Sequence, residues 1–176
     1  MGAVAATSPM VVPAVGLTAQ RPAASAHGVT TNHVRTSYSR PMTTVTITRT
    51  ALGQYVATNE AGTQLAYGEA EGQFSSVELL LAALGGCTGI DVDSITSRHG
   101  EPQAFEITVA ADKVSTPEAG NRLENVTVTF RLAFPDGEPG DAAREVLPSA
   151  AQKSHDRTCT ICRSLELPTS VEFKIE

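Results

Sequence analysis

The chain has 176 residues, of which 41% are hydrophobic and 18% charged, and its net charge is −6 at pH 7. A domain of this length can bury a core without disulfide bonds. The acidic balance and an aromatic content of only 5% exclude a basic nucleic-acid-binding surface, and the lack of ~20 consecutive apolar residues excludes a membrane-spanning helix. We therefore expect neither nucleic acid nor a membrane as a partner.

The segment 1–41 differs from the rest of the chain because it contains no acidic residue, the first being Glu60. Its Ala-, Ser-, Thr- and Pro-rich composition shows no periodicity and predicts disorder. A transit peptide fits this composition but would need an amphipathic face, and a secretory signal is interrupted by Pro13. An extension upstream of the true start is favoured, because Met42 directly precedes the first strand pattern. The folded domain is therefore predicted over 42–176.

Three short strands are predicted first, over 43–50, 54–57 and 63–67, from alternating β-branched residues and the turns between them. Farther along, strands are expected over 105–111 and 125–134, with a polar loop over 115–122. A helix follows, capped by Asp141, kinked at Pro148 and ending near Arg157. A closing strand is expected over 170–175. Strands and helices are segregated rather than alternating, which predicts the α+β class.

One long helix is predicted from Ser76 to about His99, because Ser75 and Glu78 form a capping-box pair ahead of an apolar run. Gly100 is its expected C-cap. Since the first turns are apolar on nearly every face, we expect this helix to be the buried centre of the fold. The Gly85-Gly86 pair costs about 1 kcal/mol per glycine relative to Ala, so we expect another backbone to approach there.

The three cysteines are too few for a disulfide framework or a paired zinc ribbon, so we expect reduced thiols and a cytoplasmic protein. Cys87, in the long helix, is either a packed core residue or a reactive thiol. Asp91, four residues later, would disfavour a Cys87 thiolate if the two were close.

Cys159 and Cys162 form a CxxC pair that is open to three interpretations. A thioredoxin-type pair should open a helix after a strand, whereas this pair follows a helix. A zinc site would need further ligands, and the available ones are Cys87, His155 and His99. In the third interpretation only Cys159 is functional and Cys162 packs.

Cys159 is expected at a helix N-terminus, where the helix dipole, with Arg157 and Arg163 nearby, would favour its thiolate. His155 is a possible base, and His99 is expected only to complement the dipole of the long helix. No hydrolase triad, dinucleotide-binding or phosphate-binding glycine motif is present.

Two segments together resemble a known family. Residues 75–91 (SSVELLLAALGGCTGID) resemble the central-helix motif of the OsmC/Ohr superfamily of osmotically inducible and organic hydroperoxide resistance proteins, and 154–165 (SHDRTCTICRSL) resemble its second cysteine motif. The resemblance implies a curved antiparallel sheet wrapped around a long central helix, in an intertwined homodimer. The chain departs from the family pattern at the start of the helix motif, at Thr88 in place of an aromatic residue, and at Cys162 in place of Ser or Ala. It therefore resembles the less characterised OsmC-like branch.

The resemblance also implies a catalytic role for Cys87, Cys159 and Glu78. Cys87 would attack the peroxide and Cys159 would resolve the sulfenic acid as a disulfide, while Glu78 would orient an arginine over the reactive sulfur. Glu78 lies roughly 13 Å from Cys87 along the helix axis and cannot touch it directly. Arg49 is the arginine that the N-terminal strand region offers.

The expected function is thus a thiol peroxidase that reduces organic, alkyl or lipid, hydroperoxides in oxidative-stress defence. It would need an external dithiol reductant and no cofactor or metal. A non-catalytic small-molecule-binding protein of the same fold and a CxxC redox or zinc sensor remain as alternatives.

Overall fold

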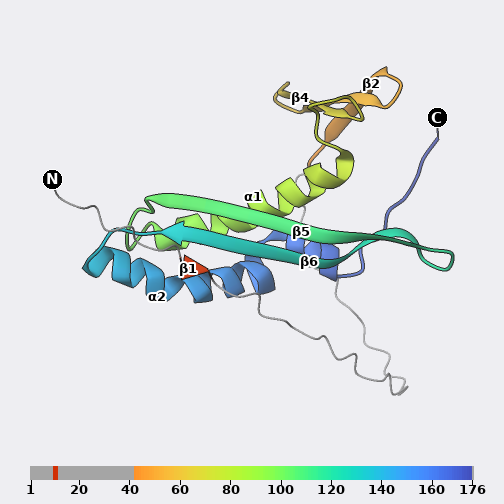
Figure 1. The fold of residues 1–176 in the computed structure, drawn as a ribbon. Helices are drawn as coiled ribbons and strands as arrows, with labels where there is room; N and C mark the ends of the chain where they lie inside the picture. The colour runs from red at the N-terminus through yellow and green to blue at the C-terminus, as the bar shows by residue number, and fades with distance from the viewer. Residues whose placement is uncertain (1–9, 12–41, 176) are drawn as a thin grey trace, which may run out of the picture. The chain divides into compact units, whose positions relative to one another are not determined.

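The structure is a computed structural model that describes residues 10–11 and 42–175. These residues fall into two compact units, one formed by 42–75 and the other by Met10–Val11 together with the chain from Ser76 onward. Strands, a long helix, two long strands and further helices follow one another along the chain (Figure 1), which confirms the predicted α+β class. Apart from the short strand β1 (Met10–Val11), the segment 1–41 lies outside the described residues.

The smaller unit is an antiparallel sheet of three strands in the order β2-β3-β4. The strands are β2 (Val45–Ala51), β3 (Gln54–Asn59) and β4 (Gln64–Gly68), each close to its predicted position. Tyr55 and Tyr67 stack across the sheet with ring centroids 5.8 Å apart. No residue of 42–75 is buried, so this sheet has no core of its own.

Glycines make the tight approach between the β2–β3 turn and the end of β4 possible. Gly53 turns β2 into β3 with a φ of +69°, a conformation that costs a glycine little. Gly68 has a φ of +143°, and a Cβ there would lie 2.2 Å from the Gly53 carbonyl oxygen. A side chain at Gly68 is therefore incompatible with this backbone.

The long helix α1 (Ser76–Thr96) begins directly after Ser75, as the capping box predicts. It ends in a turn in which the Gly100 amide donates to the Thr96 carbonyl at 3.1 Å. The helix lies at the core of the larger unit but is buried on one face only, since Ile90 on another face is 73% exposed. The buried residues form a single stripe: Leu84, Gly85, Thr88, Gly89, Val92 and Thr96.

By length and apolar content alone, α1 reaches the range of a membrane-spanning helix, contrary to the sequence expectation. Core helices of soluble proteins reach the same range. Its buried stripe packs against the strands and helix of the larger unit, as in a core helix.

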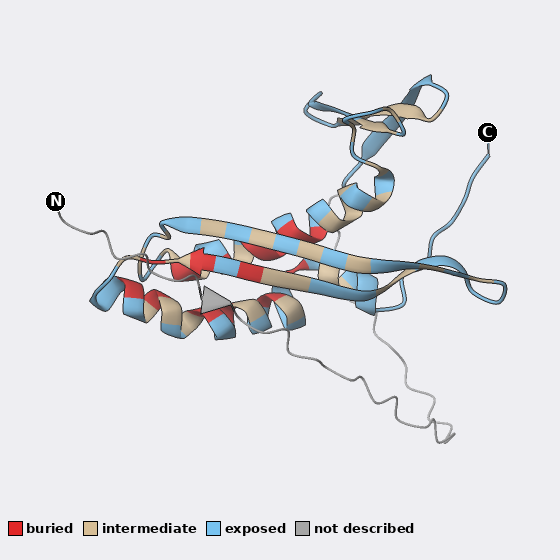
Figure 2. Ribbon diagram, in the orientation of Figure 1, coloured by how far each residue is buried: buried red, intermediate tan, exposed pale blue. Residues whose placement is uncertain are grey.

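That unit contains β5 (Ala104–Thr116), β6 (Gly120–Ala133) and α2 (Glu138–Lys153), and its sheet has the order β1-β6-β5. Both α1 and α2 lie along the β5–β6 pair (Figure 1). Exposed and half-buried residues alternate along β5, which marks a sheet with one covered face. The buried residues gather on β6, α2 and α1 (Figure 2). The core consists of Val92, Phe130, Leu132, Phe134, Ala143, Leu147 and Ala150.

Only one of the paired glycines in α1 serves a close approach. A Cβ on Gly85 would lie 2.9 Å from Cγ2 of Val109, and one on Gly89 would lie 2.7 Å from Cδ1 of Ile107. A Cβ on Gly86 would meet nothing within 4 Å. The helix thus approaches side chains of β5 through Gly85 and Gly89, rather than a backbone through both members of the pair.

Two boundary predictions are wrong. Most of the predicted loop 115–122 is strand, because the turn needs only the residues between Thr116 and Gly120. The second helix begins at Glu138 with Gly137 as its N-cap, so Asp141 lies within the first turn and pairs with Arg144 instead of capping.

The predicted closing strand 170–175 is not a strand in the part of the chain that the structure describes. Its alternation is real, yet its apolar members Val171, Phe173 and Ile175 are 74%, 91% and 100% exposed. Alternation predicts a strand only where another strand edge is available to pair with it.

We expect Gly86→Ala to raise the free energy of unfolding by up to about 1 kcal/mol, because alanine favours the helix and has free space there. Gly85→Ala gains the same propensity but overlaps the stiff Val109 side chain, at a cost of about 1–3 kcal/mol. Urea denaturation of the two variants measures the difference. Equal effects would contradict the close approach at Gly85.

Candidate functional site

The candidate site forms where the chain leaves α2. It first makes one π-helical turn, η1 (Ser154–Thr158), and then the short helix α3 (Thr160–Glu166), with Cys159 between them. The Cys159 amide donates to the Ser154 carbonyl at 3.0 Å, five residues back. Such π turns accommodate an extra residue and are frequent at functional sites. The predicted end of the helix near Arg157 therefore falls inside this turn.

Asp91 on α1 holds η1 in place. Its Oδ2 accepts hydrogen bonds from Ser154 Oγ at 2.8 Å and Thr158 Oγ1 at 2.7 Å. Ser154 is 1% exposed, so its hydroxyl depends on this carboxylate. Sequence reasoning considered Asp91 only as a neighbour of Cys87 and did not identify the two hydroxyls. The spacing of four residues between Ser154 and Thr158 places both hydroxyls on one face of a helix, and this is the sequence signal that indicates a shared partner.

The second cysteine segment is held against Cys87 in this arrangement. The Cys87 and Cys159 side chains lie close enough for Cys87 to raise the pKa of Cys159, although they come from distant parts of the chain. Cys159 is fully buried and Cys87 is half-buried. All three cysteines are free thiols. The structure thus brings together the two cysteines that the resemblance pairs, while their roles stay a prediction.

Burial raises the pKa of Cys159 to about 11. As expected, Cys159 is the N-cap of α3, and its Sγ accepts a hydrogen bond from the Cys162 amide at 3.2 Å. That hydrogen bond favours the thiolate, but the loss of hydration on burial outweighs it, and the nearby Cys87 acts in the same direction as burial. The expectation of a favoured Cys159 thiolate is therefore wrong.

Cys162 lies on the first turn of α3 and is half-buried. Burial raises the pKa of its thiol, and the Glu166 carboxylate raises it further, against a smaller opposing effect of Arg163. Arg163 itself pairs with Glu166, Nη1 to Oε2, at 2.6 Å.

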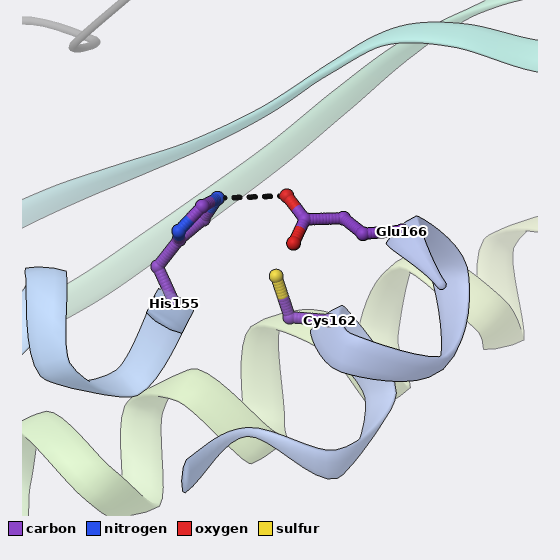
Figure 3. Close-up of side chains that lie close together, drawn as sticks. All are labelled: His155, Cys162 and Glu166. Atoms are coloured by element: carbon purple, nitrogen blue, oxygen red, sulfur yellow. Dashed lines mark ion pairs between the residues drawn. The ribbon is translucent and has the colours of Figure 1, made fainter. Parts of the chain in front are cut away.

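His155 is engaged at both ring nitrogens. Its Nδ1 lies 2.8 Å from Asp156 Oδ1, and its Nε2 lies 2.8 Å from Glu166 Oε1. The hydrogen bond with His155 is the main reason why the pKa of Asp156 is lowered. His155 Nε2, Cys162 Sγ and a Glu166 oxygen lie within 4.8 Å of one another (Figure 3). Glu166, which sequence reasoning missed, follows Cys162 by four residues, a spacing that places both on one face of a helix.

The other predicted residues lie elsewhere. Glu78 is exposed in the first turn of α1. Arg49 is exposed on β2, opposite Tyr55, in the smaller unit. His99 lies in the turn after α1, about three helical turns beyond Cys87, which separates it from the other candidate zinc ligands. The roles of Glu78 and Arg49 stay predictions.

The chain is similar to a known family and to several solved structures. A family model described as OsmC-like protein matches residues 68–174. Among solved structures, the chain is similar to an OsmC-like protein of unknown function from Vibrio cholerae, with a TM-score of 0.60 and 13% identity over 72% of this chain and 95% of that one. It is also similar to a hypothetical protein from Aquifex aeolicus, with a TM-score of 0.57 and 16% identity over 72% of this chain and 89% of that one. A third similar structure is that of an OsmC-like protein from Mycoplasma pneumoniae, with a TM-score of 0.56 and 12% identity over 71% of this chain and 87% of that one.

At these identities the structural likeness shows the fold alone, and it agrees with the predicted fold family. No sequence among curated proteins matches this chain.

The raised pKa of Cys159 predicts a loss of stability in alkaline solution. Between the ordinary value of 9.0 and about 11, the unfolded chain releases the Cys159 proton while the folded chain keeps it. The unfolded state then binds fewer protons, so the free energy of unfolding falls as the pH rises through this window and is unaffected by this group below it. Urea denaturation from pH 8 to 11 should show a shallower fall for Cys159→Ala. Parallel curves for the two proteins would contradict the assignment.

Proposed function

Since the chain belongs to the OsmC-like family, whose model covers residues 68–174, we propose that it is a thiol peroxidase that reduces organic hydroperoxides. The observation that carries the proposal is the proximity of Cys87 and Cys159, which lie on different elements and are close enough for Cys87 to raise the pKa of Cys159. A two-cysteine peroxidase needs this adjacency, because the second thiol must reach the first sulfur after it is oxidised.

In the proposed reaction the Cys87 thiolate attacks the distal oxygen of the hydroperoxide. The O–O bond breaks, the alkoxide takes a proton and leaves as the alcohol, and Cys87 becomes a sulfenic acid. The Cys159 sulfur then attacks the Cys87 sulfur, and a water molecule leaves with the Cys159 proton. An external dithiol, available in a reducing compartment such as the cytoplasm, restores both thiols.

The raised pKa of Cys159 suits the second role better than the first. A buried thiol that keeps its proton is a poor nucleophile toward peroxide. Its proton is available for the hydroxyl group that leaves the sulfenic acid. Cys87 is the more exposed of the two sulfurs and so is the better placed to meet a substrate.

An apolar substrate is supported by the residues next to Cys87 on α1. Leu80 and Ala83 precede Cys87 by seven and four residues, which places them on the same side of the helix, and neither is buried. An alkyl or lipid hydroperoxide would gain from contact with them, whereas hydrogen peroxide would not.

The thiolate of Cys87 also needs a cation. Arg49, oriented by Glu78, is the group that the family resemblance implies for this task. Both residues are part of the proposal.

A homodimer belongs to the same proposal. The sheet of 42–75 has no buried residue, and a three-stranded sheet of this kind needs a covering surface for its apolar side chains. Val45 and Ile47 on β2 are 53% and 50% exposed. Within the described residues, the alternating tail that includes Phe173 pairs with no strand. A second copy of the chain offers such a surface.

The reaction is tested by adding one equivalent of cumene hydroperoxide to the reduced protein and mapping disulfides by mass spectrometry. We expect a Cys87–Cys159 bond and release of one equivalent of cumyl alcohol. Cys87→Ser should reduce peroxide consumption to the uncatalysed rate, whereas Cys159→Ser should allow one turnover and leave a sulfenic acid that dimedone traps. Cys162→Ser is the matched control and should retain turnover.

Other outcomes would replace this proposal. A Cys159–Cys162 bond with Cys87 intact would move the redox chemistry to the CxxC pair. Intact thiols in the presence of peroxide would favour a non-catalytic binding protein of the same fold.

Sedimentation equilibrium of the reduced protein should give twice the chain mass of 18.4 kDa. Replacing exposed Ile47 by Lys should shift the equilibrium toward the single chain, because it places a charge on the surface that the second copy would cover. A single-chain mass for the unmodified protein at micromolar concentration would contradict the dimer.

A further inference from the structure

Three side chains that the peroxidase reaction does not use converge beside the cysteine pair. His155 comes from η1, and Cys162 and Glu166 come from one face of α3. Figure 3 shows the imidazole, the thiol and the carboxylate directed toward a common point. One possible ligand atom from each lies within 4.8 Å of the others. Nitrogen, sulfur and oxygen donors thus meet at a single place.

The imidazole is already oriented as in a metal ligand. Its Nδ1 lies 2.8 Å from Asp156 Oδ1, and Asp156 in turn accepts a hydrogen bond from Gln152 Nε2 at 2.9 Å. A carboxylate on the outer nitrogen of a histidine fixes the ring and directs the other nitrogen toward a metal. The nitrogen that remains, Nε2, is the one that faces Glu166.

The carboxylate is oriented in a similar way. Arg163 Nη1 binds Glu166 Oε2 at 2.6 Å, so Oε1 is the oxygen that faces His155 Nε2, across 2.8 Å. A cation among these groups would take the place of the proton between that nitrogen and oxygen. Zinc bonds of about 2.0–2.3 Å in tetrahedral geometry place two ligand atoms about 3.3–3.6 Å apart. The 2.8 Å pair would therefore widen slightly, and any pair near the 4.8 Å limit would close by about 1 Å, which side-chain rotation can supply.

The donor set selects the class of metal. Calcium and magnesium require sites made of oxygen ligands, whereas a set of imidazole, thiolate and carboxylate suits zinc and its neighbours among the divalent transition metals. Three protein ligands leave the fourth tetrahedral position to water. The His155 and Glu166 side chains are each 40% exposed, so an ion has access from solvent.

We propose that His155, Cys162 and Glu166 bind one zinc-class divalent cation, with Asp156 and Arg163 as the outer residues that position two of the ligands. On binding, Cys162 releases its thiol proton to solvent and coordinates as thiolate. The site is distinct from the Cys87–Cys159 pair and does not depend on the proposed peroxidase activity. A bound cation would also keep Cys162 from disulfide exchange with its neighbouring thiols.

The test is a zinc titration of the full-length protein, reduced with a phosphine, in competition with a chromophoric chelator. We expect one zinc per chain. With cobalt as the probe, a sulfur-to-cobalt charge-transfer band in the near ultraviolet should report thiolate coordination. Cys162→Ser should remove this band, and His155→Gln and Glu166→Gln should each weaken zinc binding by at least about tenfold.

Two variants of the same residue types outside the site are the matched controls. Cys159→Ser, which retains an N-cap residue for α3, and His99→Gln should leave zinc affinity and the cobalt band unchanged. Far-ultraviolet circular dichroism shows which variants are folded. Asp156→Asn should weaken zinc binding about 10–100-fold yet give the full cobalt band at saturation, as expected for a positioning residue.

Three results would overturn the proposal. These are the absence of stoichiometric zinc binding, retention of the cobalt band in Cys162→Ser, and loss of binding in Cys159→Ser with full affinity in His155→Gln. The last result would assign the metal to the CxxC pair instead.

Discussion

The arrangement of the site depends on one carboxylate, that of Asp91. It accepts hydrogen bonds from Ser154 and Thr158, which lie at the first and last positions of the π-helical turn. Because Ser154 is buried, this contact fixes the turn to α1 more firmly than an exposed hydrogen bond would. The turn is followed directly by Cys159, so the same contact sets where the second cysteine segment lies relative to Cys87. A residue with no role in the proposed chemistry therefore helps to hold Cys159 near Cys87.

With the second cysteine segment held in this way, the three thiols lie in different environments. Cys159 is fully buried and keeps its proton, because burial outweighs the amide hydrogen bond at the start of α3. Cys162, one turn later, faces His155 and Glu166 near the surface. Cys87 is half-buried on the central helix. One buried thiol beside a more accessible one suits a reaction in two steps, while the third sulfur, among nitrogen and oxygen donors, suits a metal.

Much of the fold is predictable from the sequence, because hydrophobic periodicity and capping residues act locally. The strands of 42–75 and the start of α1 after Ser75 lie close to their predicted positions. The errors occur where a local signal depends on a distant partner. The tail 170–175 alternates as a strand does, but the described chain offers it no edge to pair with. Asp141 resembles a helix cap, but Gly137 takes that place because a proline is accepted in the first turn.

For the site, the sequence by itself determined which residue types are present and in what order: a cysteine in a long apolar helix and a CxxC segment near the end of the chain. Only the tertiary structure decided how exposed those residues are and which of them lie together. Burial reverses the effect of the helix N-terminus on Cys159, and the extra residue of the π turn places His155 opposite Glu166. Neither effect is visible in spacing along the chain, because solvent exposure and the meeting of separate segments are properties of packing.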